Sequence, residues 1–174
     1  MIDATSERQL HLLGEVVELL GGRDVPFWLR GGWALDFLLG AVTRRHADID
    51  LVARLGDQEI VRDTLIEHAF RLVRHEPDVA MDFTKNGESV QVLLVDRLAD
   101  GKLVVRGRFY WLLLPGGALD GPRHTLGGIT CRVLTPAALL DEKERYGGHR
   151  GRPLRDKDRV SMELLRSLLA RQRP

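Results

Sequence analysis

The sequence has few of the residues that build disulfide frameworks, zinc sites or membrane spans. It contains 174 residues and a single cysteine, Cys131, which excludes an internal disulfide and a four-cysteine zinc site. No run approaches the roughly 18 apolar residues of a transmembrane helix. The N-terminus lacks the basic and apolar regions of a secretory signal. We therefore expect a cytoplasmic protein with no membrane partner.

Aromatic residues are also scarce, at 6%, and no basic stretch alternates with them as in proteins that stack on nucleic-acid bases. The formal net charge is only +1, although the first 100 residues are acidic and the remainder is basic. Nucleic acid is therefore not an expected partner. The basic segment 145–159 is suited to clamping a triphosphate or to solvation, and nothing in the sequence indicates an oligomeric state.

The hydrophobic content of 44% is that of a globular chain, and the length fits one domain. Ser6 and Gln9 form a capping-box pattern at the start of the first predicted helix. Residues at helical spacing predict helices over 6–20, 33–39, 58–69, 136–146 and 156–170. Short apolar runs predict strands over 27–29, 48–52, 72–73, 79–84, 89–95, 103–105 and 109–114.

Asn86-Gly87 is a strong hairpin signal, so 79–84 and 89–95 are expected to pair. The order of elements predicts an α+β fold with a small mixed β-sheet flanked by helices and a helical C-terminal end. We expect residues 1–134 to form the core and residues 135–174 to form a helical extension packed on the same domain.

Two carboxylates, Asp48 and Asp50, lie two residues apart on a predicted strand and therefore point to the same face. Their repulsion is relieved when a cation lies between them, and hard cations such as Mg²⁺ prefer oxygen ligands together with phosphate. A strand end neutralised by nearby arginines is the simpler alternative.

Two glycines, Gly31 and Gly32, separate a predicted strand from a predicted helix. Glycine allows a close approach of the backbone, and the start of the helix offers free N–H groups to a phosphate. A tight turn without a ligand is the alternative. A phosphate-binding turn followed 17 residues later by paired carboxylates describes a metal–triphosphate site.

The segment GGWALDFLLG-x-x-TR-x-H-x-DIDL resembles the signature of the aminoglycoside 2''-adenylyltransferases and lincosamide nucleotidyltransferases, within the DNA polymerase β-like superfamily. The resemblance extends more loosely to Thr135-Pro136 and to DKDRVSMELL near the end of the chain. It implies the nucleotidyltransferase fold. It also implies Mg²⁺-dependent transfer of a nucleoside monophosphate from a nucleoside triphosphate, with ATP as the expected donor, to a hydroxyl group.

The resemblance also suggests roles for individual residues of this sequence. Asp48 and Asp50 match the metal carboxylates and are predicted to be catalytic. The predicted nucleotide-binding residues are Gly31, Gly32, Arg44 and His46. Lys143, on the helix after Pro136, is a further candidate for a phosphate contact, or is a surface charge.

The family has a third carboxylate on the second strand of the hairpin, and this base position falls on Gln91 in the present sequence. An amide neither accepts a proton from an attacking hydroxyl nor adds negative charge for a metal. Asp82 on the partner strand and Glu88 at the turn are candidate replacements.

Two functional hypotheses follow. The first is an antibiotic-modifying nucleotidyltransferase that acts on a small hydroxylated acceptor. The second is a catalytically silent protein of the same fold that binds a nucleotide or small ligand, because Gln91 replaces the third carboxylate. Aminoglycosides favour an acidic cleft, whereas a lincosamide-like acceptor does not need one.

Overall fold

A computed structural model describes residues 3–106, 113–149 and 153–172. Its centre is a mixed β-sheet whose main path has the strand order β3-β4-β5-β2-β1-β9-β8. The strands of this path are β1 (Phe27–Arg30), β2 (Ile49–Arg54), β3 (Arg71–Glu76), β4 (Ala80–Lys85), β5 (Glu88–Arg97), β8 (Arg123–Leu126) and β9 (Ile129–Val133). Two short strands, β6 (Leu103–Val104) and β7 (Leu113–Leu114), extend from the end of β5.

The sheet is mixed because the chain crosses over twice near its centre. Strand β2 pairs parallel with β5, and β1 pairs parallel with β9. All other strand pairs are antiparallel, including β1 with β2. The register places Arg30, Asp50, Gln91 and Asp82 directly opposite one another on four neighbouring strands. Opposite residues point to the same face, so these four polar side chains form one row across the sheet.

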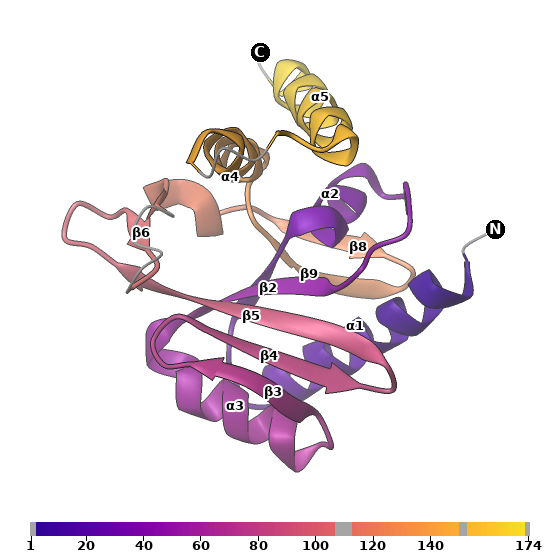
Figure 1. Ribbon diagram of the computed structural model, residues 1–174, viewed down its shortest axis with the longest axis vertical. Coiled ribbons are helices and arrows are strands. Elements are labelled where there is room, and N and C mark those ends of the chain that lie inside the picture. The colour runs from indigo at the N-terminus through magenta and orange to yellow at the C-terminus, as the bar shows by residue number, and fades with distance from the viewer. Residues whose placement is uncertain (1–2, 107–112, 150–152, 173–174) are drawn as a thin grey trace.

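The helices cover the sheet unequally (Figure 1). Helices α1 (Ala4–Gly21) and α3 (Gln58–Glu67) pack on one face, where the buried residues Phe83, Val90 and Val92 point. Helices α2 (Gly31–Leu39), α4 (Pro136–His149) and α5 (Asp156–Arg171) contact one another beyond the other face. Figure 1 shows no helix of the described chain in front of β3, β4 and β5. The polar row therefore runs from the α2–α4–α5 group onto an open part of the sheet.

The predicted α+β class, the mixed sheet and the Asn86-Gly87 hairpin are confirmed. Asn86 and Gly87 have φ values of 53° and 80°, the backbone conformation of a tight two-residue turn. The helix after Thr135 begins at Pro136, as expected.

Some local predictions were wrong. The N-cap of α1 is Asp3, whose carboxylate accepts hydrogen bonds from the N–H groups of Thr5 and Ser6. Ser6 is instead buried and donates its hydroxyl to Asp3. The β8–β9 hairpin was not predicted at all. The structure describes only Leu113–Leu114 of the strand predicted over 109–114, and residues 109–112 lie outside the described residues.

Within the described residues, no helix combines the length and the apolar character needed to cross a membrane.

Candidate active site

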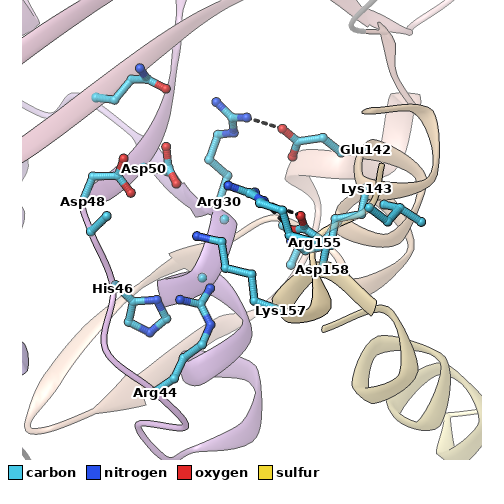
Figure 2. A pocket seen from close by; sticks show the side chains of 16 residues that line it. Arg30, Arg44, His46, Asp48, Asp50, Glu142, Lys143, Arg155, Lys157 and Asp158 are labelled. Carbon is cyan, nitrogen blue, oxygen red and sulfur yellow. Dashed lines mark hydrogen bonds and ion pairs between the residues drawn. The ribbon is translucent and has the colours of Figure 1, made fainter. Parts of the chain in front are cut away.

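The predicted site residues meet around one cavity of about 350 Å³ between the sheet and the helices α2, α4 and α5. Of the predicted residues, those that line it are Gly31, Gly32, Arg44, His46, Asp48, Asp50, Gln91 and Lys143. Other side chains complete the wall: Arg30, Glu142 and Asp158, which the sequence analysis did not assign to the site, and Arg155 and Lys157 of the basic segment 145–159. The cavity therefore joins segments from both ends of the chain (Figure 2).

Asp48 and Asp50 supply the carboxylates at the sheet side of the cavity. Asp48 directly precedes β2 and Asp50 is the second residue of that strand. Burial raises the pKa of Asp50, and the charge of Asp48 raises it further, while Arg30 acts in the opposite direction. A carboxylate that is desolvated beside another carboxylate favours a bound cation, because a cation removes the repulsion.

The glycine turn lies directly against these side chains. Gly31 has a φ of 67°, and a Cβ atom there would come within 2.2 Å of Asp50 Oδ2. A Cβ atom on Gly32 would come within 2.2 Å of His46 Nδ1 and 2.7 Å of Arg44 Nη2. A side chain at either position would therefore force these neighbouring side chains to move, and at Gly31 the positive φ disfavours a side chain as well.

Helix α2 begins at this turn, and no N-cap side chain binds its first backbone N–H groups. Its N-cap residue, Arg30, makes no side-chain cap hydrogen bond. The first N–H groups of a helix have no partner within the helix, and they carry the positive end of the helix dipole. An anion such as a phosphate group would satisfy them.

The cations of the cavity fall into two groups. Lys143 Nζ lies 3.2 Å from Asp158 Oδ1, and Arg155 Nε lies 2.7 Å from Asp158 Oδ2. In contrast, Arg44 and Lys157 have no ion-pair partner among the described residues. Figure 2 shows both side chains directed into the cavity. Their positive charges are available to a ligand, whereas that of Lys143 is already paired.

Arg30 is the main residue that the sequence analysis missed. It forms an ion pair with Glu142 that connects β1 to α4. Burial acts to lower its pKa, but Glu142, Asp50 and Asp48 outweigh burial and the pKa is raised. A charged residue at the end of an otherwise apolar strand, next to the glycine turn, was the signal in the sequence.

His46 is positioned by a buried network of side chains and has little contact with solvent. Its Nε2 lies 2.6 Å from Asp36 Oδ2, and both side chains are almost fully buried. Thr43 donates its hydroxyl to the other oxygen of Asp36, and the ring of Trp33 packs against the imidazole at 4.6 Å. The network positions the Nδ1 edge of His46 beside Gly32.

Gln91 faces the cavity, but its amide is oriented by a neighbour. Its Nε2 donates to Asp82 Oδ1 at 3.1 Å, and Arg74 Nε lies 2.9 Å from Asp82 Oδ2. A carboxylate only accepts hydrogen bonds, so the NH₂ group has to face Asp82. The amide oxygen is therefore left for the opposite side, where Asp50 lies on the next strand.

The two candidate replacement bases do not reach the cavity. Asp82 does not line it, and both of its oxygens are bound by Gln91 and Arg74. Glu88 is buried and binds Arg8 and Gln9 of α1. It is three residues from Gln91 on the same strand, and therefore points to the opposite face of the sheet.

The residues present fit a divalent cation of the hard type. Asp48 and Asp50 provide carboxylate oxygens, and the amide oxygen of Gln91 is a further oxygen donor of the type that Mg²⁺ and Ca²⁺ accept. Within the described residues, no group of three or more His, Cys, Asp and Glu is arranged around a metal position. A cation here would need phosphate or water oxygens to complete its coordination.

The sequence of this chain is similar to a protein family and to individual proteins whose activities are known. The profile of the family described as "Aminoglycoside-2''-adenylyltransferase" matches residues 12–165. A 2''-aminoglycoside nucleotidyltransferase from Escherichia coli is 40% identical over 60 residues, which cover 33% of this chain and 34% of the relative. A protein of the same name from Klebsiella pneumoniae matches equally well. These matches span about a third of the length of the curated relatives.

Two solved structures have a similar fold over most of the chain. ANT(2'')-Ia in complex with adenylyl-2''-tobramycin has a TM-score of 0.76 at 22% identity, covering 93% of this chain and 90% of that one. A lincosamide antibiotic adenylyltransferase with bound lincomycin has a TM-score of 0.69 at 20% identity, covering 90% and 95%. At these identities the similarity establishes the nucleotidyltransferase fold.

Proposed function

Because the chain belongs to the aminoglycoside-2''-adenylyltransferase family, we propose that it transfers a nucleoside monophosphate from a nucleoside triphosphate to a hydroxyl group of a small molecule. We propose Mg²⁺ as the cofactor and ATP as the donor. The observation that carries the proposal is the meeting of Asp48 and Asp50 with the uncapped start of α2 in one cavity.

Each group of residues has a distinct part in this mechanism. The N–H groups at the start of α2, Arg44 and Lys157 bind the β- and γ-phosphates and stabilise the charge of the leaving pyrophosphate. Asp48 and Asp50 would hold Mg²⁺, which supplies charge neutralisation at the α-phosphate when bound. The gain from these residues is chiefly orientation and electrostatic stabilisation.

The bond changes balance as follows. The acceptor oxygen forms a bond to the α-phosphorus, and the bond from that phosphorus to the oxygen bridging to the β-phosphate breaks. Pyrophosphate leaves with the electron pair. The hydroxyl proton passes to solvent, because Gln91 has no basic group and both oxygens of Asp82 are committed.

The test is a transfer assay on the purified protein with Mg²⁺, ATP and a panel of hydroxylated acceptors, including tobramycin and lincomycin. Release of pyrophosphate, and a product heavier by one nucleoside monophosphate in mass spectrometry, would support the proposal. Asp48→Asn and Asp50→Asn should abolish Mg²⁺-dependent binding of ATP, as measured by calorimetry. Unchanged affinity in both variants would remove the metal-site assignment.

A second candidate function is supported by Gln91. With no carboxylate at the base position, the protein would bind a nucleotide with Mg²⁺ and not turn it over. Tight binding of Mg²⁺ and ATP together with no transfer to any acceptor would favour this alternative.

A further inference from the structure

The position of the phosphate-binding cations determines the end of the cavity from which an acceptor hydroxyl can attack. In transfer at phosphorus, the attacking and leaving oxygens lie roughly in line on opposite sides of the phosphorus atom. Figure 2 shows Arg44 and Lys157, which we assign to the β- and γ-phosphates, at one end of the cavity and Glu142 at the other. Because pyrophosphate leaves toward Arg44 and Lys157, the hydroxyl group has to approach from the end at which Glu142 lies.

A search of the cavity for a proton acceptor leaves one carboxylate. Among the described residues, the lining carboxylates are Asp48, Asp50, Glu142 and Asp158. The first two are assigned to Mg²⁺. Both oxygens of Asp158 accept hydrogen bonds, from Lys143 and Arg155. Glu142 accepts from Arg30 through Oε1 alone, and its Oε2 atom has no partner within the described part of the chain.

Arg30 holds this carboxylate close to the proposed metal ligands. It is the last residue of β1 and lies directly opposite Asp50 on β2. Its ion pair with Glu142 orients a side chain that is only 12% exposed. Burial is the main cause of the raised pKa of Asp50, and the negative charge of Glu142 contributes to the rise, so the two carboxylates are electrostatic neighbours. A carboxylate that is bound through one oxygen can still accept a hydrogen bond through the other.

We propose that Glu142 is the general base of the transfer, with Oε2 as the atom that takes the proton of the acceptor hydroxyl. This inference rests on the proposed function and identifies the group that receives the proton before it passes to solvent. As the acceptor oxygen bonds to the α-phosphorus, its O–H bond breaks and the proton moves to Oε2. Pyrophosphate leaves with the electron pair of the broken bond to phosphorus. The base therefore lies on α4 instead of at position 91 on β5.

Single-turnover transfer from ATP to tobramycin, or to lincomycin if tobramycin is not an acceptor, tests the assignment. Glu142→Gln keeps the size of the side chain and an oxygen for Arg30, but it removes the basic group. We expect the rate to fall about 10²–10⁴-fold, because a positioned base contributes that much. Glu144→Gln is the matched control, since Glu144 lies on the same helix, pairs with Arg166 and does not line the cavity. Equal rates in wild type, Glu142→Gln and Glu144→Gln would overturn the inference.

The affinity for a non-hydrolysable ATP analogue with Mg²⁺ separates catalysis from support of the nucleotide site. Glu142→Gln removes a negative charge, so calorimetry should show that it binds the polyanionic analogue at least as tightly as the wild type does. A loss of affinity as large as the loss of rate would mean that Glu142 only maintains the site, which would overturn its assignment as the base. A wild type that transfers to no acceptor would contradict the proposed function itself, and this inference with it.

A carboxylate introduced at position 91 provides a readout that a purely structural role of Glu142 would not affect. The pair of substitutions Asp82→Asn and Gln91→Asp places it there without a second carboxylate beside it. Added to Glu142→Gln, this pair should raise the transfer rate at least about tenfold, because the proton then has a new acceptor. No recovery would indicate that Glu142 acts only through Arg30, and would overturn the assignment.

Discussion

At the residue scale, the structure adds a physical reason for the two glycines that the sequence did not show. The sequence predicted that Gly31 and Gly32 give room to a phosphate. In the structure, that room is limited first by Asp50, His46 and Arg44, which come close to the missing Cβ positions. The turn therefore fixes the carboxylate and the basic residues relative to the helix start before any ligand binds.

Gly31→Ala should damage the site more than its backbone strain explains. The φ of 67° disfavours any side chain, and the new Cβ would collide with Asp50 Oδ2. We expect a loss of stability of about 1–2 kcal/mol from the backbone and a tenfold or greater loss of affinity for Mg²⁺ and ATP, equivalent to about 1.4 kcal/mol. Urea unfolding and calorimetry measure the two effects.

Gly40 provides the matched control for this variant. Its φ of 70° is almost the same, and nothing lies within 4 Å of its Cβ position. Gly40→Ala should therefore lose similar stability but retain nucleotide affinity. If both variants bind Mg²⁺ and ATP as well as the wild type, the glycine turn is not part of the nucleotide site.

Gln91 and Asp82 lie opposite each other on adjacent strands. A double substitution can therefore move the carboxylate from position 82 to position 91. Gln91→Asp alone would place two carboxylates side by side, which destabilises a sheet. The double variant Asp82→Asn/Gln91→Asp keeps an amide–carboxylate pair and moves the negative charge one strand closer to Asp50. A positioned base contributes about 10²–10⁴ in rate, so single-turnover transfer should rise in the double variant and less in Gln91→Asp.

Asp82→Asn alone is the control for this pair, and its single-turnover rate should be almost the same as that of the wild type. The opposite pattern would be fast transfer by the wild type that collapses in Asp82→Asn. Asp82 would then be the base despite its hydrogen bonds to Gln91 and Arg74.

At the scale of elements, the helices α4 and α5 are joined to each other through one carboxylate. Asp158 on α5 accepts from Lys143 on α4 and from Arg155 at the N-cap of α5. Burial acts to raise the pKa of Asp158, but these two cations outweigh it and the pKa is lowered below 3.8. The cavity wall formed by the two helices therefore depends on an ionised Asp158.

This pKa shift predicts a dependence of stability on pH. A carboxyl whose pKa is lower in the folded state stabilises the protein above its unfolded pKa, and the contribution is lost as the pH falls through the folded value. We expect Asp158→Asn to lower the free energy of unfolding by about 1–3 kcal/mol at pH 7. The difference from wild type should shrink on acidification below pH 3.8. Urea titrations at several pH values test this, and a difference independent of pH would contradict it.

Sequence patterns predicted some of the helices and strands better than others. The Asn86-Gly87 turn requires positive φ at two positions, so the hairpin could be predicted from local chemistry alone. The capping box at Ser6 failed because the helix begins earlier, at Ala4, where Asp3 accepts hydrogen bonds from the N–H groups of Thr5 and Ser6. The β8–β9 hairpin was missed because its strands are short and partly exposed, which leaves no clear apolar alternation.

At the scale of the whole molecule, the sequence analysis singled out those residues of the candidate site that are close to one another in the chain. The glycines and the two carboxylates lie within 20 residues of one another, so their spacing carried the information. The ion pair of Arg30 with Glu142 joins residues 112 positions apart, and only the packing of α4 on the core brings them together. Lys157 likewise reaches the cavity only through the packing of α5 against α4 and α2.

Ligand binding should be visible in the stability of the entire chain. A ligand that binds only the folded state stabilises it by about 2.7 kcal/mol when present at 100 times its Kd. For a chain of this size, each kcal/mol raises Tm by about 2–4 °C, so Mg²⁺ and ATP should raise Tm by about 5–10 °C. Differential scanning fluorimetry measures the shift. EDTA, Asp48→Asn or Asp50→Asn should each remove most of it, because the triphosphate then lacks the cation that links it to the carboxylates. A shift that persists in all three conditions would mean that ATP binds elsewhere on the protein.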